Sequence, residues 1–153
     1  MTVRTSAGTT IKVSASAPAT FNAAGYNALT FTTVGEVTDL GEFGREFTLV
    51  THNPVGSRGT QKFKGSFNEG TINLSLGLDT DDAGQVLMKA ASLADTAYSF
   101  EVTTQNGDSY FFQAIVMSFK VNVGSVDSIT TATTTLELTT TAAGVGIVED
   151  LAA

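Results

Sequence analysis

Two stretches of the chain alternate strictly between apolar and polar residues, and this period of two restricts the possible folds more than any other feature. In TINLSLGL, residues 71–78, the apolar positions are Ile72, Leu74, Leu76 and Leu78. In AYSFEVTT, residues 97–104, they are Tyr98, Phe100 and Val102. Successive side chains of a strand project to opposite faces of a sheet. Each stretch therefore predicts a strand with one face in a core.

The dipeptide Asn106-Gly107 connects the second of these strands to a longer extended run, residues 109–122. Asn-Gly suits a type I′ hairpin turn, whose two central residues need a positive φ. We therefore predict a hairpin of 97–104 with 109–122. Alternation in the longer run and just beyond it places these apolar side chains on one face: Ile115, Met117, Phe119, Val121 and Val123.

A second hairpin is predicted from residues 60–67 and 71–78, which are separated by Asn-Glu-Gly. Gly70 can adopt the left-handed conformation that such a connection requires. Further β-prone runs predict shorter strands near residues 9–14, 28–34, 46–52 and 129–138.

One segment, DTDDAGQVLMKAASLAD, has helical periodicity. Asp79 or Thr80 is suited to begin the helix, because a short polar side chain there can cap free backbone N–H groups. The apolar stripe expected to pack on a sheet consists of Ala83, Val86, Leu87, Ala90 and Leu93 or Ala94.

Together these elements predict a mainly β protein, a sandwich or barrel of about eight strands with one flanking α-helix. A chain of 153 residues suits a single domain. We expect that domain to span residues 1–138, followed by a short C-terminal tail, residues 139–153, without a clear period.

The chain carries 15 carboxylates against 8 lysines and arginines, a net charge of −7. Nucleic-acid affinity comes largely from cations that displace counterions from phosphates, so we expect no tight binding of DNA or RNA. No run of about 18 apolar residues exists, which predicts no transmembrane helix and no membrane partner. The absence of cysteine removes disulfides and thiolate sites, and it suits synthesis in a reducing cytoplasm.

Few residues could carry chemistry. His52 is the only histidine, and without cysteine it offers no usual transition-metal ligand set. Asp79, Asp81 and Asp82 lack the spacing of a calcium loop, and a helix N-terminus already favours carboxylates. The carboxylates of residues 36–46 could include a glycosidase pair, but the chain has no tryptophan to form a sugar platform. We predict no catalytic residue, no metal and no cofactor, and therefore no enzyme.

The segment GEVTDLGEFGRE, residues 35–46, places four carboxylates, three glycines and one arginine between two β-like runs. Besides catalysis, two interpretations remain, an ordinary solvated loop and a surface for another protein. Arg58, Lys62 and Lys64 follow with the opposite charge. On a strand face they would be solvated, or they would meet the acidic segment of a neighbouring copy in a head-to-tail contact.

Three groups of residues occur in a fixed order: GEVTD at 35–39, KGSF at 64–67 before the predicted helix, and MSFK followed by GSVDS within 117–128. In this order, over about residues 28–138, the chain resembles the tail tube (major tail) proteins of long-tailed bacteriophages, the siphophages. None of these motifs is catalytic, and it is their order that carries the resemblance.

The resemblance implies two packed β-sheets with a side helix, in a subunit that self-assembles into hexameric rings stacked into a tube. One sheet of each subunit would join its neighbours' sheets around the lumen, and an open sheet edge suits such pairing. The implied partners are further copies of the chain and other tail proteins, namely the tape measure, the tail tip and the terminator. The implied location is the virion, after synthesis in the host cytoplasm.

In the family, a long loop between early strands reaches the adjacent ring. The matching region is about residues 41–59, and its glycines and charges suit a segment that becomes ordered only in the tube. Its candidate contact residues are Gly41, Glu42, Phe43, Gly44, Arg45, Glu46, His52, Asn53, Pro54 and Arg58.

DNA would pass through the tube without specific binding, so its wall should carry more carboxylates than bases. The candidate lumen residues, on or beside the polar faces of the predicted hairpins, are Glu69, Glu101 and Asp108. The expected function is that of a structural protein of the tail, a conduit for DNA delivery into the host. The alternatives are a related tail component, either a terminator or the tube of a contractile tail, and a carbohydrate-binding β-sandwich.

Overall fold

The computed structural model describes residues 3–152, which form ten strands and two helices. In chain order these are β1 Thr10–Ser14, α1 Ala23–Asn27, β2 Thr32–Thr33, β3 Val37–Asp39, β4 Glu46–His52, β5 Gln61–Asn68, β6 Thr71–Gly77, α2 Ala83–Leu93, β7 Tyr98–Thr103, β8 Ser109–Asn122, β9 Thr131–Thr139 and β10 Val148–Asp150. The mainly β architecture predicted from the sequence is confirmed.

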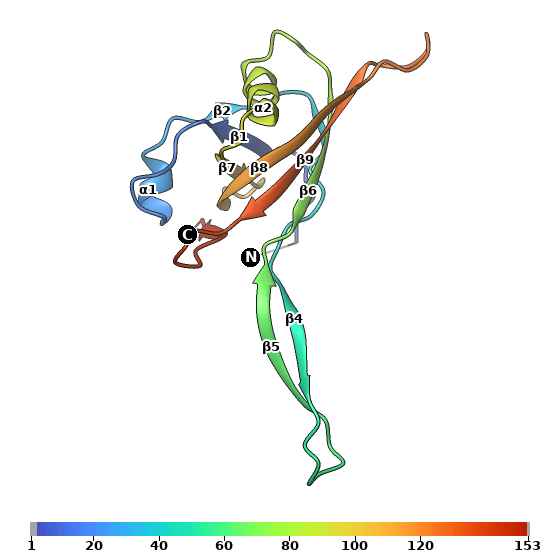
Figure 1. Cartoon of the computed structure of the whole chain (residues 1–153). Helices are drawn as coiled ribbons and strands as arrows, with labels where there is room; N and C mark the ends of the chain where they lie inside the picture. Colours follow the sequence, from blue (N-terminus) through green and yellow to red (C-terminus); the bar gives the residue numbers. More distant parts are fainter. Residues whose placement is uncertain (1–2, 153) are drawn as a thin grey trace.

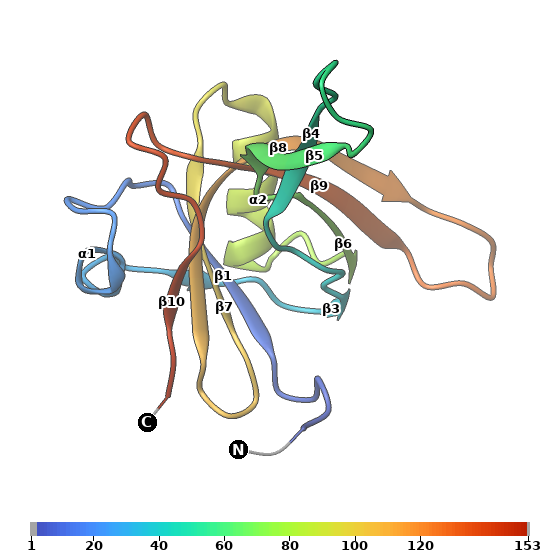
Figure 2. The same ribbon diagram turned by 90° about the horizontal axis from the view of Figure 1, so that it is seen from below.

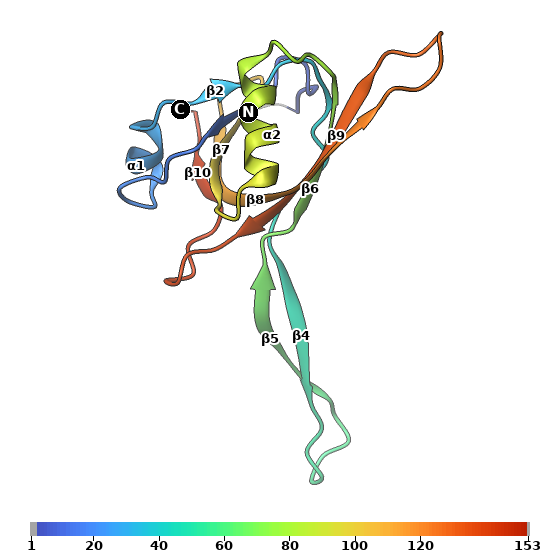
Figure 3. The same ribbon diagram turned by 45° about the horizontal axis from the view of Figure 1, so that its top comes forward.

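Eight of the strands form one antiparallel sheet that curls around the core (Figure 1). Seven lie in the order β2-β1-β7-β8-β9-β6-β3, and β10 pairs with the start of β8. Figures 2 and 3 show α2 on the inner side of the curl, where it packs against β8, β1 and β2. The other two strands, β4 and β5, form a separate hairpin that projects from one end of this body.

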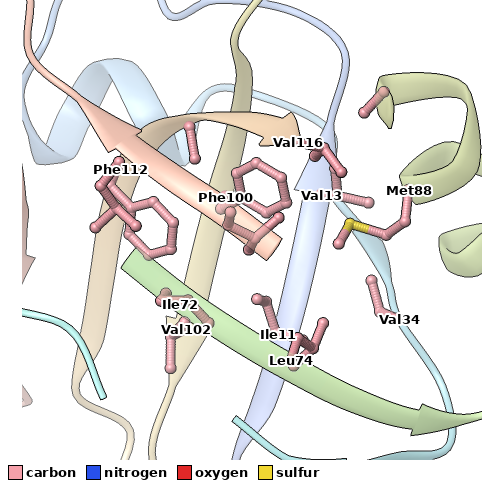
Figure 4. Packing of buried hydrophobic residues seen from close by; sticks show 14 of the residues in the cluster. Ile11, Val13, Val34, Ile72, Leu74, Met88, Phe100, Val102, Phe112 and Val116 are labelled. Carbon is pink, nitrogen blue, oxygen red and sulfur yellow. The ribbon is translucent and has the colours of Figure 1, made fainter. Parts of the chain in front are cut away.

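The core fills the inner side of the curled sheet. The alternation in residues 71–78 and 97–104 is confirmed, because Ile72, Leu74 and Leu76 have no exposed surface and Phe100 is equally buried. Figure 4 shows Ile72, Leu74 and Phe100 converging with side chains from β1, β8 and α2. Burial of one such large apolar side chain contributes about 1.5–3 kcal/mol to stability, so this cluster holds the sheet in its curl.

The hairpin of β7 with β8 is confirmed, and its register places Thr103 opposite Ser109. Its turn differs from the predicted type I′ geometry. Gly107 has a φ of 93°, whereas Asn106 does not have a positive φ. Gly107 N donates to Thr104 O at 3.0 Å, so a tight turn precedes a single left-handed glycine.

The predicted hairpin of 60–67 with 71–78 is wrong. β5 pairs with β4, whereas β6 pairs with β9 and β3. Gly70 has the expected positive φ, 103°, but it leads the chain from the projecting hairpin into the body. Alternation predicts that a strand forms and which face is buried, but the partner strand is chosen by contacts distant in the sequence.

A bulge in β8 places the apolar residues after Met117 on the opposite face of the strand from Met117 itself. The register shifts between Val116 and Ser118, so Met117 has no partner on β9. An extra residue in one strand moves the alternation by one position. Met117 is accordingly 61% exposed, while Phe119 packs against the core. The prediction that Met117 and Phe119 share a face is therefore wrong.

Helix α2 begins later than predicted and turns a different face inward. Asp82, rather than Asp79 or Thr80, is the N-cap, and its side chain accepts a hydrogen bond from Gln85 N at 3.0 Å. Val86 and Leu93, which belong to the predicted apolar stripe, are exposed. The residues actually buried are Gly84, Gln85, Met88 and Ala91.

Gln85 and Gly84 explain this rotation of α2. The Gln85 amide donates to the backbone carbonyls of Gly35 and Gly77, at 3.1 and 2.9 Å, which satisfies a polar group that would otherwise be costly to bury. A Cβ on Gly84 would lie 2.2 Å from Thr33 O, so only glycine allows the helix to approach the sheet this closely. Neither contact is visible in a helical hydrophobicity pattern.

Three elements were not predicted: α1, β3 and β10. On α1, Tyr26 stacks on Phe111 of β8 with ring centroids 5.2 Å apart. Burial raises the pKa of Tyr26 above its usual value, and a hydrogen bond with Gln113 offsets only part of that rise. β10 pairs with β8 and places Val148 opposite Phe111, so part of the expected tail belongs to the sheet. Each of these elements has five residues or fewer, too short to display a period.

Candidate assembly surfaces

The β4–β5 hairpin is almost fully exposed. All seven residues of β4 and six of the eight in β5 are exposed. Within residues 3–152 the two strands pair only with each other, from Glu46 opposite Asn68 to His52 opposite Gln61. Both outer edges therefore carry backbone groups without a strand partner, and such edges readily pair with another chain.

Both faces of the hairpin carry large apolar side chains. Leu49 lies opposite Lys64 and Val50 opposite Phe63, and residues directly opposite one another share a face. Leu49, Val50 and Phe63 are 62%, 46% and 54% exposed. Neither face has a core to cover it, and exposed apolar surface of this kind marks a contact with another surface.

The hairpin and the rest of the chain carry opposite charge. Residues 45–68 contain four cations, Arg45, Arg58, Lys62 and Lys64, and a single carboxylate, Glu46. All other residues together contain four cations and fourteen carboxylates. The projecting element is therefore basic and the body is acidic, which is the complementarity that favours contact between two copies.

An ion pair fixes the base of the hairpin to the body. Arg45 Nε donates to Glu69 Oε1 at 2.6 Å, and the Arg45 guanidinium lies 3.8 Å from the ring centroid of Phe67. Glu69 Oε2 accepts a hydrogen bond from Ile147 N at 2.8 Å. One carboxylate thus joins the start of β4, the end of β5 and the C-terminal segment before β10.

Residues 41–45 are also docked on the body. Phe43 contacts Tyr110 and Phe112, with ring centroids 5.4 and 5.9 Å apart, and Gly44 N donates to Glu69 O at 3.2 Å. The expectation of a single loop over 41–59 is therefore corrected, whereas its ordering on assembly stays a prediction. That region consists of a docked base, the strand β4 and the start of the tip, residues 53–60.

The structure brings the predicted contact residues together only in part. Gly41, Glu42, Phe43, Gly44 and Arg45 lie at the base, Glu46 and His52 at the two ends of β4, and Asn53, Pro54 and Arg58 in the tip. The exposed apolar residues of β4 and β5 were not predicted as contacts. The sequence signal for them is the adjacent pair Leu49-Val50, which must place apolar side chains on both faces of one strand.

Of the candidate lumen residues, Glu69 is misplaced. It is only 2% exposed and is paired with Arg45, so it does not lie on an exposed polar face. Glu101 on β7 lies 3.9 Å from Lys12 Nζ through its Oε1. Asp108, in the turn after β7, accepts a hydrogen bond from Ala152 N at 2.7 Å. A place in a lumen stays a prediction for Glu101 and Asp108.

A second open edge lies along the outer half of β8. β7 pairs with β8 only as far as Ala114, and no strand in the described residues pairs with that side of 115–122. Beyond this edge the connection to β9 exposes Val123, Val126 and Ile129, which are 67%, 101% and 81% exposed. Figure 3 shows this β8–β9 extension projecting at the end opposite to the β4–β5 hairpin.

A groove of about 230 Å³, the α2–β8 groove, lies between α2 and the β8–β9 extension. Its apolar lining residues are Leu78, Val86, Phe119 and Val121, and its charged ones are Asp79 and Lys89.

Among residues 3–152, no group of three or more histidines, aspartates or glutamates could hold a metal ion. The helices described there are also too short or too polar to cross a bilayer.

This fold occurs in a chain of the cryo-EM structure of the anti-feeding prophage (AFP) baseplate, symmetrised six-fold. The two superpose with a TM-score of 0.66 over 91% of this chain and 93% of that chain, at 10% sequence identity. No family model and no characterised protein matches the sequence. At this identity the likeness establishes the fold, and function has to be argued from the surfaces.

Proposed function

We propose that this protein is a non-enzymatic structural protein of a phage tail, whose copies form hexameric rings stacked into a tail tube. The observation that carries the proposal is the β4–β5 hairpin, which is basic, apolar on both faces and open at both edges, on an acidic body. A fold shared with a chain of a prophage baseplate supports it.

The two kinds of open edge suit two kinds of contact between copies. An edge that pairs with a different edge of the next copy makes a heterologous contact, which closes into a ring or continues as a filament. The outer half of β8 is suited to join sheets within a ring, and the hairpin, which projects along the long axis of the molecule, is suited to join one ring to the next. The six-fold symmetry of the baseplate structure supports a ring of six.

The charge of the body suits a conduit. A wall rich in lysine and arginine would hold DNA by releasing counterions, whereas an acidic wall repels it over roughly 8 Å at physiological salt. The proposed tube therefore passes DNA without binding it. Its partners are further copies and the tape measure, tail tip and terminator, and its location is the virion, after synthesis in the host cytoplasm.

A related tail component is the second candidate. The structural neighbour belongs to a baseplate. The exposed strand edges would also suit a terminator or the tube of a contractile tail. A terminator differs from either kind of tube in how many copies join, since a tube continues and a terminal ring does not.

Electron microscopy of the purified protein at increasing concentration tests the proposal. We expect rings, and then tubes of uniform diameter, whereas a terminal component would stop at single rings. The variant Leu49→Asp should abolish stacking, because it puts a negative charge at an exposed apolar position of the hairpin, and Thr96→Asp, in an exposed loop of the body, should not. A protein that stays monomeric at every concentration, and when mixed with tail tips, contradicts the proposal.

A further inference from the structure

We infer that the α2–β8 groove is the surface of a second copy that receives the β4–β5 hairpin. The inference rests on the proposed function and names the contact that stacks one copy on the next. Its occupant is the hairpin face that carries Leu49, Lys62 and Lys64.

The hairpin and the groove lie at opposite ends of the molecule. In Figures 1 and 3 the hairpin projects downward, while α2 and the β8–β9 extension lie at the top. A contact between opposite ends of identical subunits leaves a free hairpin and a free groove at the two ends of every stack. Such a heterologous contact propagates without limit, as a tube requires.

Two departures from the sequence pattern create the apolar lining of the groove. The hydrogen bonds of Gln85 rotate α2, so that Val86 is 54% exposed although it belongs to the apolar stripe. The bulge at Met117 turns Phe119 and Val121 toward α2, and Val121 is left 51% exposed. The fold of one copy gains nothing from exposing Val86 and Val121, but an apolar side chain from another copy would cover them.

The charges at the groove match those of the hairpin. Asp79 lines the groove and Asp81, which is exposed, follows at the approach to α2; Asp79 Oδ1 accepts a hydrogen bond from Asp81 N at 3.0 Å. Lys89 is the cation of the lining. On the hairpin Lys64 lies opposite Leu49 and Lys62 opposite Thr51, so both lysines share the face of Leu49, and the Lys64 ammonium lies 4.7 Å from the ring centroid of Phe47. Leu49 would enter the groove while the lysines meet the carboxylates, which fixes the orientation of the contact.

Disulfide trapping between two single-cysteine variants tests the contact, because the chain contains no cysteine of its own. Copies with Leu49→Cys are mixed with copies carrying Val86→Cys, allowed to assemble, and oxidised. We expect covalent heterodimers in high yield, since a disulfide needs Cα atoms within about 7 Å. The matched control is Leu93→Cys on the same helix, which is 82% exposed but does not line the groove. It should give no heterodimer.

The outcomes separate this inference from the proposed function. Tubes that form without a Leu49–Val86 disulfide, or with equal trapping at Leu93, overturn the groove as acceptor and leave the tube intact. Failure of the unmodified protein to form rings or tubes overturns the proposed function, and the inference with it.

A charge exchange provides a second test that does not depend on oxidation. The double variant Lys62→Glu/Lys64→Glu should raise the concentration for half-maximal assembly by at least roughly tenfold, because like charges would then face one another. Adding Asp79→Lys and Asp81→Lys in the same chain should restore assembly to within a few-fold of the original. Absence of any restoration, with all variants folded by circular dichroism, contradicts the pairing.

Discussion

The curled sheet and the β4–β5 hairpin both contain large apolar residues, but the sheet buries them and the hairpin exposes them. In the sheet, Leu74, Leu76 and Phe100 have no exposed surface, whereas Leu49 and Phe63 on the hairpin are more than half exposed. Both regions are antiparallel strands with apolar side chains. The difference is that the sheet curls over α2 and its own core, while the hairpin extends into solvent. An apolar pattern therefore specifies a strand. Whether the apolar side chains of that strand are buried depends on which other segments of the chain pack against it.

The comparison separates stability from assembly. An isolated two-stranded hairpin is marginally stable in water, so the body must hold the hairpin in place through its base. Changes in the body should lower the free energy of unfolding, and changes on the hairpin should chiefly alter association. The following predictions test that division, with all stabilities measured below the concentration at which copies associate.

Leu76→Ala should have the largest effect on stability. Leu76 is fully buried on β6, and large-to-small changes in a core cost about 2–5 kcal/mol, because apolar burial is lost and a cavity remains. Urea unfolding followed by circular dichroism measures the loss. A loss below about 1 kcal/mol would mean that the register of β6 is different from the one described.

Gly84→Ala tests the close approach of α2 to the sheet. Alanine favours a helix interior over glycine by about 0.8–1 kcal/mol, but its Cβ would meet backbone atoms of Thr33 and Val34 that no rotamer change can move. Overpacking of about 1–3 kcal/mol should outweigh this preference, for a net loss of up to about 2 kcal/mol in thermal or urea unfolding. Gly56→Ala is the control, since nothing lies within 4 Å of that position. A gain in stability at position 84 would contradict the packing.

Arg45→Met tests the base of the hairpin, which belongs to both regions. The change removes the charge that faces the buried carboxylate of Glu69 but keeps much of the side-chain volume. A fully buried pair would cost about 3–5 kcal/mol to break, but the Arg45 side chain is 39% exposed and water screens it, so about 1 kcal/mol is expected. Hydrogen exchange should also become faster at Glu69 and Ile147. The exposed Glu46→Gln is the control. An equal effect of both variants would show that the Arg45–Glu69 ion pair does not hold the base of the hairpin on the body.

The same division explains how much of the fold the sequence revealed. The strands at 46–52 and 109–122 were predicted with their observed ends, because long alternating or β-branched runs favour the extended conformation through local preferences alone. The partner of β5 was predicted wrongly, because pairing with β4 rather than β6 depends on β9 occupying the edge of β6. The inward face of α2 was also predicted wrongly, since the hydrogen bonds of Gln85 reach backbone carbonyls distant in the sequence.

The candidate surface was visible in the sequence only in outline. The residues themselves marked the acidic, glycine-rich segment 35–46 and the cations Arg58, Lys62 and Lys64. The resemblance to tail tube proteins supplied both the bounds 41–59 and the role of that region. Phe43 packs on Tyr110 and Phe112 of β8. Glu69 is buried where it accepts hydrogen bonds from Arg45 Nε and from Ile147 N. Contacts between segments so far apart leave no local signal.

Leu49→Ala should have the smallest effect on stability and a large one on association. Leu49 contacts no core in the described chain, so its truncation should change the free energy of unfolding by no more than about 0.5 kcal/mol, as for exposed positions in general. In assembled tubes the same side chain would be buried, and assembly should require a higher concentration. Amide hydrogen exchange gives an independent view, because residues 46–52 should exchange fast in free copies and slowly in tubes. Equal protection in both states, or a stability loss above about 1 kcal/mol, would show that the hairpin packs within its own chain, and the contrast with the curled sheet would then disappear.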